Sequence, residues 1–260
     1  MSSAYLQQLF GLDDQVVVVI GGTGVLGGAL CEGLAQAGAH VVVVGRNEER
    51  GQQRVDAIGK LGGQASFAAV DASSRASLEQ LRDTLVQRHG RIHGLINGVG
   101  VNAGTPYLEI SEEEFHRIFE TNLYSTHLAC QTFLPHMLDA GGGAIVNIGS
   151  VTSFLPLSRV YAYAAAKAAI LNLTQNLARE YAPQKVRINC LCPGFFPAEQ
   201  NRKILDPQRI ADIMRHTPMA RFGEPSELVG ATLLLLSPNA GSFLTGAALY
   251  VDGGFTSMTI

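Results

Sequence analysis

The chain has 260 residues, of which 47 % are hydrophobic and 16 % are charged, and its formal net charge is −3. This composition supplies a large core and argues against the basic electrostatic footprint of a nucleic-acid-binding protein. The apolar runs are far shorter than the roughly 20 residues that a membrane-spanning helix needs, so we expect no membrane segment.

The four cysteines are scattered without a Cys-x-x-Cys pair, at Cys31, Cys130, Cys190 and Cys192. This arrangement suggests neither a zinc site nor a disulfide framework, and a reduced compartment is the simpler interpretation. The N-terminal stretch MSSAYLQQLFGLDDQ lacks the basic and apolar regions of a signal peptide. We therefore expect a cytoplasmic protein that holds no metal.

Short, mostly β-branched segments alternate with longer helical segments along the whole chain. Strands are predicted at 16–20, 40–44, 65–70, 92–98, 143–150, 186–192 and 247–254. Helices are predicted at 25–37, 47–61, 74–89, 111–139, 158–181 and 225–236. Near-continuous apolar strands are typical of parallel sheets covered on both faces. The pattern predicts a single α/β domain over 1–260, a Rossmann-like three-layer α/β/α sandwich with a seven-stranded parallel sheet.

Several residues predict where the helices begin and end. Ser111 followed by Glu114 is typical of a capping box at a helix start. Pro135 should kink or shorten the helix over 111–139, because proline lacks the backbone N–H that a helix interior needs. Pro183 should end the helix over 158–181, whereas Pro225 suits the first position of a helix.

A glycine-rich turn, VVVVIGGTGVLGGAL, follows the first predicted strand and leads into a helix. Gly21, Gly24 and Gly27 permit a tight turn that a diphosphate can approach, and the helix start at Val25 and Leu26 supplies N–H donors. The alternative is a glycine-rich turn without a ligand. Because the turn lies between a strand and a helix, we expect nucleotide binding.

The end of the second predicted strand bears on cofactor choice. An acidic residue there binds the ribose 2′-hydroxyl of NAD, whereas a nearby arginine accepts the 2′-phosphate of NADP. The sequence has Gly45 in the acid's place, followed by Arg46, which favours NADP(H) over NAD(H). Alternatively, Arg46 is solvated and Glu48 or Glu49 contacts the ribose. Asp71, after the third strand, is expected to bond the adenine amino group or to cap a helix.

Tyr163 and Lys167 lie four residues apart in the helical segment YAYAAAKAAI and so share one helix face. Ser150 lies 13 residues before the tyrosine and ends a predicted strand. Asn122 stands in the middle of a predicted helix, where asparagine is a poor choice by propensity. Tyr161 lacks a lysine four residues on, so packing is its expected role.

These motifs, in this order and spacing, resemble those of the short-chain dehydrogenase/reductase (SDR) family, and the resemblance covers nearly the whole chain. The resemblance implies that Tyr163 is the general acid/base and that Lys167 lowers its pKa and holds the nicotinamide ribose. It also implies that Ser150 orients the substrate oxygen and that Asn122 holds a water of a proton relay. A phenol needs such tuning because its ordinary pKa, about 10, is too high for proton exchange near neutrality.

The resemblance implies three further cofactor contacts, and the sequence departs from the family's usual motifs in two places. Asn97, Pro193 and Gly194 stand at positions where the family binds its cofactor. Ile20 replaces the threonine of the family's opening motif TGxxxGxG, and Val25 replaces its middle glycine. The usual NNAG reads NGVG from Asn97 onward. Because that threonine usually braces the asparagine segment, the two departures are expected to be coupled.

The segment 195–223 has the weakest pattern and follows a strand, where ligands dock in open α/β sheets, so we interpret it as a substrate-binding lid. Its GFFPAEQNRK element resembles the SDR branch of D-mannonate oxidoreductase, or fructuronate reductase. The expected substrate-binding residues of the lid are Gln200, Asn201, Arg202 and Lys203, alongside Ser150. Alternatively, the two lid cations are simply solvated.

Three functions therefore stand at this point. The first is an oxidoreductase for a sugar acid or a related polar ketone or alcohol. The second is another SDR activity, such as a gluconate 5-dehydrogenase or a 3-oxoacyl-thioester reductase. The third is a non-catalytic nucleotide-binding regulatory protein, which would not need the tyrosine–lysine pair. The helices over 111–139 and 158–181 are apolar around much of their circumference and pair across a two-fold axis in this family, so a homo-oligomer, namely a tetramer, is expected.

Overall fold

The computed structural model describes residues 3–196 and 206–258. Its strands form one sheet in the order β3-β2-β1-β4-β5-β6-β7, and every neighbouring pair is parallel. The strands are β1 (Val16–Ile20), β2 (His40–Gly45), β3 (Gln64–Ala69), β4 (Gly94–Asn97), β5 (Gly143–Ile148), β6 (Val186–Pro193) and β7 (Ala248–Val251). The predicted seven-stranded parallel sheet is confirmed.

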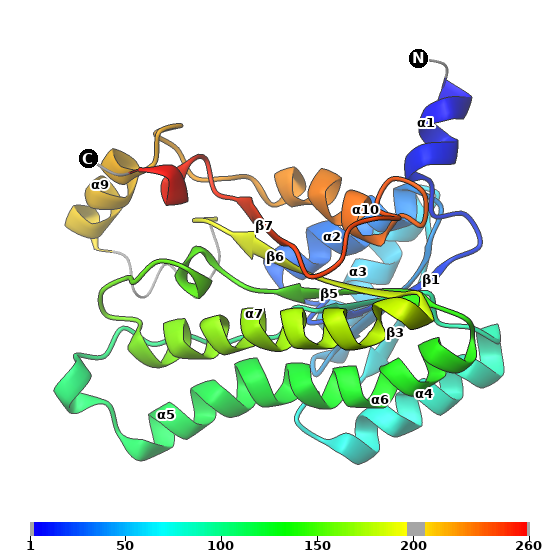
Figure 1. Cartoon of the computed structure of the whole chain (residues 1–260), viewed down its shortest axis with the longest axis horizontal. Helices are drawn as coiled ribbons and strands as arrows, with labels where there is room; N and C mark the ends of the chain where they lie inside the picture. The colour runs from blue at the N-terminus through cyan, green and yellow to red at the C-terminus, as the bar shows by residue number, and fades with distance from the viewer. Residues whose placement is uncertain (1–2, 197–205, 259–260) are drawn as a thin grey trace.

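Helices cover both faces of this sheet (Figure 1). The α-helices are α1 (Ser3–Phe10), α2 (Val25–Gln36), α3 (Glu48–Lys60), α4 (Arg75–His89), α5 (Glu112–Phe119), α6 (Ser125–Asp139), α7 (Tyr161–Tyr181), α9 (Pro207–His216) and α10 (Val229–Leu236). Helices α2, α3 and α10 pack on one face, and α4, α6 and α7 pack on the other. The result is the expected three-layer sandwich.

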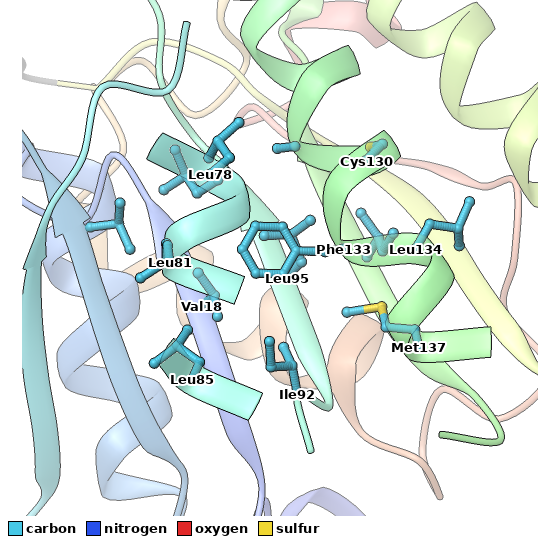
Figure 2. Close-up of a cluster of buried hydrophobic side chains, with 14 of the residues drawn as sticks. Val18, Leu78, Leu81, Leu85, Ile92, Leu95, Cys130, Phe133, Leu134 and Met137 are labelled. Atoms are coloured by element: carbon cyan, nitrogen blue, oxygen red, sulfur yellow. The ribbon is translucent and has the colours of Figure 1, made fainter. Parts of the chain in front are cut away.

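Strand β1 shows why its sequence is a continuous apolar run. All five of its residues are buried. Val17 and Val19 belong to the core beneath α2, whereas Val16, Val18 and Ile20 belong to the core beneath α4 and α6. Successive side chains of a strand point to opposite faces, so a strand covered on both sides needs apolar residues throughout. Figure 2 shows the second of these cores, with side chains of β1, α4, β4 and α6 in one cluster.

The helix predicted over 111–139 is divided by a π-helical turn, η2 (Glu120–Tyr124), between α5 and α6. Single π turns inside α-helices frequently mark functional sites. Asn122 lies within this turn, which explains how a poor helix former is accommodated. Of the two effects expected of Pro135, shortening does not occur, since α6 continues through it to Asp139.

The other end signals are mostly confirmed. Ser111 accepts a hydrogen bond from the Glu114 backbone N–H, but the Glu114 carboxylate binds the Thr105 hydroxyl and does not complete a capping box. Helix α7 ends two residues before Pro183, and the 3-10 turn η5 begins at Pro225. Helices α1 and α9 were not predicted, and α7 begins at Tyr161, three residues later than expected. No helix in the described part of the chain has the length and apolar character that a membrane crossing requires.

Candidate active site

The glycine turn after β1 closes against the end of β4. Gly21 has φ +88°, and a Cβ there would lie 2.8 Å from the Gly98 carbonyl carbon. A Cβ on Gly27 would lie 2.3 Å from the Gly21 carbonyl oxygen. Both positions therefore require glycine, the first for its backbone angle and the second for space. Gly24 is less constrained, because the nearest atom to a Cβ there would be 3.3 Å away.

Helix α2 begins at this turn with an open N-terminus. Gly24 is its N-cap and supplies no side-chain acceptor, whereas α3, α4, α5 and α9 each have a side-chain cap. The N–H groups of Val25, Leu26 and Gly27 thus form the uncapped first turn, a site suited to a diphosphate. Val25 is 45 % exposed, so the valine that replaces the family's glycine points outward and does not obstruct the turn.

The packing at the end of β2 explains why position 45 is a glycine and not the acidic residue that binds NAD. A Cβ on Gly45 would lie 2.5 Å from the Thr23 hydroxyl oxygen, so Thr23 occupies the space that a side chain at position 45 would need. Arg46 follows and is exposed. The Asp71 carboxylate accepts hydrogen bonds from the backbone N–H and hydroxyl of Ser73, which hold its pKa below the ordinary value, and Arg46 adds a smaller effect in the same direction.

Asp71 does not cap a helix, contrary to one of the two expectations. The N-cap of α4 is Ser74, whose hydroxyl accepts from the Ser77 backbone N–H. The electrostatic effect of Arg46 on Asp71 instead shows that β2 and β3 bring a cation and an anion to the same edge of the sheet. Sequence reasoning missed Thr23, and its only signal was its position inside the glycine turn.

Ser150, Tyr163 and Lys167 come together between β5 and α7. The Ser150 hydroxyl accepts from the Thr152 backbone N–H at 3.2 Å and also hydrogen-bonds the Tyr163 phenol. The Lys167 Nζ lies 5.5 Å from the centroid of the Tyr163 ring. It donates to the Ile148 carbonyl at 2.7 Å, which fixes the ammonium at the end of β5. The structure thus brings these three residues together.

The local environment acts on both titrating groups. Burial raises the pKa of the Tyr163 phenol to about 12, while the Ser150 hydrogen bond lowers it. Burial lowers the pKa of the Lys167 ammonium to about 8, and the neighbouring thiols of Cys190 and Cys192 oppose this. Lys167 is only 3 % exposed. The pKa of Tyr163 thus lies above its ordinary value, contrary to the expectation that Lys167 lowers it, because burial outweighs the Ser150 hydrogen bond.

Asn122 is fully buried and approaches the same site from the π turn. Its side-chain amide donates to the carbonyls of Ile118, at 2.8 Å, and Val101, at 2.9 Å. Its Oδ1 has no hydrogen-bond partner among the described residues. A Cβ on Gly100 would lie 2.6 Å from this Oδ1 and 3.6 Å from the Lys167 Nζ. The Asn122 Oδ1, an acceptor without a partner among the described residues, therefore lies near the Lys167 Nζ. Gly100 lies beside both atoms, and a larger residue there would fill the space next to them.

A buried polar network lies behind these residues and was not predicted. The Asn97 amide donates to Asn147 Oδ1 at 2.8 Å, and the Asn147 amide donates to the Thr174 hydroxyl at 2.9 Å. The network thus joins β4, β5 and α7. Asn97 is in register with Ile20 on β1, and its Oδ1 has no partner in the described structure. Ile20 cannot donate a side-chain hydrogen bond, but its carbonyl accepts from the Gly98 N–H at 2.9 Å. Ile20 and the NGVG segment, the two departures from the family pattern that were expected to be coupled, are thus in direct contact.

Pro193 ends β6, and Gly194 follows it and leads into the lid. The Gly194 N–H donates to the Val251 carbonyl at 2.9 Å, and a Cβ on Gly194 would lie 2.7 Å from the Asp252 Cα. A cavity of about 370 Å³ follows, between the chain after β6 and the residues after β7. Its described lining does not include Ser150, Tyr163 or Lys167.

The four lid residues expected to bind substrate, Gln200, Asn201, Arg202 and Lys203, lie outside the described residues. Of the lid over 195–223, the structure describes residues 195–196 and 206–223, which include α9. Arg159 pairs with Asp206, and Arg209 donates to the carbonyl and hydroxyl of Ser158, so the described part of the lid is attached to the segment before α7. Among the described residues, no group of three or more His, Cys, Asp or Glu side chains is arranged to hold a metal ion.

Comparisons with known proteins agree with this geometry. The family model described as "Enoyl-(Acyl carrier protein) reductase" matches residues 24–256. An "Uncharacterized oxidoreductase UxuB" of Bacillus subtilis (strain 168) is 36 % identical over 94 % of this chain and 95 % of its own length. The 3-oxoacyl-[acyl-carrier-protein] reductase FabG of Chlamydia pneumoniae is 33 % identical, over 92 % of this chain and 96 % of that protein.

A solved structure is similar to this chain in both fold and sequence. The gluconate 5-dehydrogenase of Burkholderia cenocepacia J2315, in complex with NADP and tartrate, superposes with a TM-score of 0.93. It is 32 % identical, and the match covers 97 % of this chain and 99 % of that one. The cyclopentanol dehydrogenase of Comamonas sp. (strain NCIMB 9872) is 34 % identical over 95 % of this chain and 98 % of its own length.

Proposed function

The chain belongs to the short-chain dehydrogenase/reductase family and is an oxidoreductase acting on CH–OH groups; on this premise we propose that it interconverts the ketone and secondary alcohol of a sugar acid, with Tyr163 as the group that moves the proton. The observation that carries the proposal is the cluster of Ser150, Tyr163 and Lys167. A protein that only bound the nucleotide would need no serine–phenol hydrogen bond beside a buried ammonium.

Each residue of the site has its own proposed role in the reaction. When bound, the nicotinamide cofactor supplies or accepts the hydride. Ser150 hydrogen-bonds the substrate oxygen and orients it, while the Thr152 N–H holds the Ser150 hydroxyl oxygen in place. Tyr163 gives a proton to that oxygen during reduction and takes one during oxidation. Lys167 stabilises the phenolate and holds the nicotinamide ribose, and Asn122 Oδ1 accepts from a water that links the lysine to solvent.

The cofactor proposal is NADP(H) over NAD(H). Arg46 is exposed at the end of β2, and Thr23 covers Gly45, so the position of the NAD-binding acid is empty and a hydroxyl lies next to it. An arginine and a hydroxyl are donors suited to a 2′-phosphate. The diphosphate belongs at the open N-terminus of α2, over Val25 and Leu26. The solved gluconate 5-dehydrogenase relative contains NADP, which supports this choice.

We commit to a polar, anionic substrate of the D-mannonate/D-fructuronate kind. The support is the resemblance of the lid sequence, with its neighbouring amides Gln200 and Asn201 and its cations Arg202 and Lys203. Amides suit sugar hydroxyls, and guanidinium and ammonium groups suit a carboxylate. The complex of a relative with tartrate, a hydroxy acid, supports the same chemical class.

A gluconate 5-dehydrogenase activity is the second candidate, and the structural match to that enzyme is the observation that favours it. A 3-oxoacyl-thioester reductase is also represented among the relatives, but the charged, amide-bearing lid favours a small polar substrate over an acyl chain. A regulatory protein without turnover stays the alternative of another class.

A substrate panel tests the proposal. The enzyme is assayed with D-fructuronate, 5-keto-D-gluconate and acetoacetyl-coenzyme A under both NADPH and NADH, following cofactor absorbance. We expect the highest kcat/KM with D-fructuronate and NADPH. Preference for 5-keto-D-gluconate would select the second candidate, preference for the thioester would reject a sugar acid, and no turnover of any carbonyl would favour the regulatory alternative.

We also propose a cytoplasmic homotetramer. All four cysteines are free and buried, as suits a reducing compartment. Large hydrophobic side chains on the α5–α6 helix remain exposed, namely Phe115, at 41 %, and Tyr124, at 49 %. A second copy would cover them. The measurement is the solution mass at micromolar concentration, and a monomer would contradict the tetramer.

A further inference from the structure

The short turn η3 (Val151–Ser153) connects the serine of the site to the helix of the site. Ser150 is its N-cap, and the Ser153 hydroxyl accepts a hydrogen bond from the Ser150 backbone N–H at 3.2 Å. The same hydroxyl donates to the backbone carbonyl of Lys167 at 2.8 Å. One side chain therefore bridges the main chains of Ser150 and Lys167, which are 17 residues apart in sequence.

This bridge has an unusual place in the hydrogen-bond pattern. Lys167 lies inside α7, where its carbonyl also has a partner one helical turn on. The Ser153 hydroxyl is thus an additional donor to a mid-helix carbonyl, and it is not needed to satisfy a helix end. Its evident consequence is geometric: it holds η3 against α7 at the turn that carries Lys167, one turn after Tyr163.

Two side-chain contacts hold this part of the site to Lys167: the Ser153 hydroxyl donates to its backbone carbonyl, and its own ammonium donates to the Ile148 carbonyl. A Cβ on Gly149 would lie 3.0 Å from the Ser153 Oγ and 2.6 Å from the Cys190 Sγ, so the backbone before Ser150 is packed closely against both. The Ser150 Oγ is held from the other direction by the Thr152 N–H at 3.2 Å. The hydroxyl that contacts Tyr163 is therefore positioned by its own turn, and that turn is tied to α7 through Ser153.

We propose that Ser153 is a positioning residue of the active site, whose hydroxyl sets the separation between the Ser150 hydroxyl and the Tyr163–Lys167 face of α7. The inference rests on the proposed roles of Ser150 and Tyr163. Ser153 itself does not touch the reacting atoms. Small displacements matter at such a site, since a shift of about 1 Å can cost on the order of a hundredfold in rate.

The experiment compares Ser153→Ala, which removes both hydrogen bonds, with Ser153→Thr, which retains the hydroxyl. Ser153 is only partly buried. With the best substrate of the panel, we expect Ser153→Ala to lower kcat about tenfold with little change in KM, and Ser153→Thr to restore most of the activity. Thr132→Val is the control: it removes a buried hydroxyl of α6 that has no hydrogen-bond partner among the described residues, and it should keep wild-type kcat.

A second readout needs no substrate. The ionisation of Tyr163 is followed by tyrosinate absorbance in the NADP⁺ complex, with Tyr163→Phe identifying its signal among the seven tyrosines. Cys192 on β6 raises the pKa of this phenol, and Lys167 on α7 lies 5.5 Å from its ring centroid; both are unchanged in the variants. Because the Ser150 hydrogen bond lowers the pKa of Tyr163, Ser153→Ala should raise it, and Ser153→Thr should not.

The outcomes separate this inference from the proposed function. If no carbonyl is turned over but the Tyr163 titration shifts in Ser153→Ala, the substrate proposal fails and the positioning role stands. If Ser153→Ala keeps both the wild-type kcat and the wild-type titration, the positioning role is refuted. An equal loss of kcat in Ser153→Ala and Ser153→Thr would also refute it, because the hydroxyl would then not be the cause.

Discussion

The two halves of the sheet's carboxyl edge are built by different means. On the side of β1 and β2, the structure works through backbone and space: Gly21 and Gly27 permit a close turn, and Gly45 leaves room for Thr23. On the side of β5 and α7, side chains form the site, and nearly every one of them has a partner. The first half tolerates departures such as Val25, which points outward, whereas the second half retains all four residues that the resemblance predicts.

The largest expected effect concerns the half built from side chains. Tyr163→Phe removes the hydroxyl that we propose moves the proton but keeps the ring beside Lys167, so kcat should fall by about 10²- to 10⁴-fold. The dissociation constant for NADPH, measured by fluorescence titration, should change little. Full turnover of an identified substrate by this variant would show that Tyr163 is not the acid/base.

The next prediction concerns the glycine turn. Gly27→Ala places a Cβ 2.3 Å from the Gly21 carbonyl oxygen, so the turn has to open, at a cost of about 1–3 kcal/mol. NADPH binding should weaken by more than tenfold, since the open turn no longer presents the helix N-terminus. Gly24→Ala is the matched control, because its Cβ would be 3.3 Å from the nearest atom. Equal effects of both variants would show that space is not the constraint here.

Arg46→Gln should have a smaller and more selective effect. Losing a charge-assisted hydrogen bond to the 2′-phosphate should weaken NADPH binding about tenfold and leave NADH binding unchanged. Isothermal titration with the two cofactors measures the difference. If both cofactors lose affinity equally, Arg46 contributes only a general positive charge, and the distinction between NADP and NAD lies elsewhere.

The smallest effect is expected behind the site. Thr174→Val leaves the buried Asn147 amide without its acceptor, which should lower the free energy of unfolding by about 1–3 kcal/mol. Thermal melting measures the loss, and Asn176→Ala, at an exposed position of the same helix, should show none. An unchanged melting temperature for Thr174→Val would show that the network adds no stability to the half built from side chains.

Prediction from sequence succeeded where local pattern decides the structure. The continuous apolar run of β1 follows from coverage on both faces, and the four-residue spacing of Tyr163 and Lys167 follows from helix geometry. The π turn at Asn122 was not predicted, because the local sequence is the same as that of an α-helix with an unfavourable asparagine. The roles of Thr23 and Ser153 were not predicted for another reason. Thr23 contacts Gly45 and Ser153 contacts Lys167, and only the folded chain brings these segments together.

The packing of Thr23 over Gly45 also restricts how cofactor preference can change. Introducing an acid at position 45 alone would bring its Cβ to 2.5 Å from the Thr23 hydroxyl oxygen, so this single step disturbs the glycine turn before any ribose contact forms. A smaller residue at position 23 has to come first or together with it. The route from the proposed NADP(H) preference to NAD(H) therefore passes through a coupled pair of substitutions, which sets the minimum design for anyone who wishes to make that change.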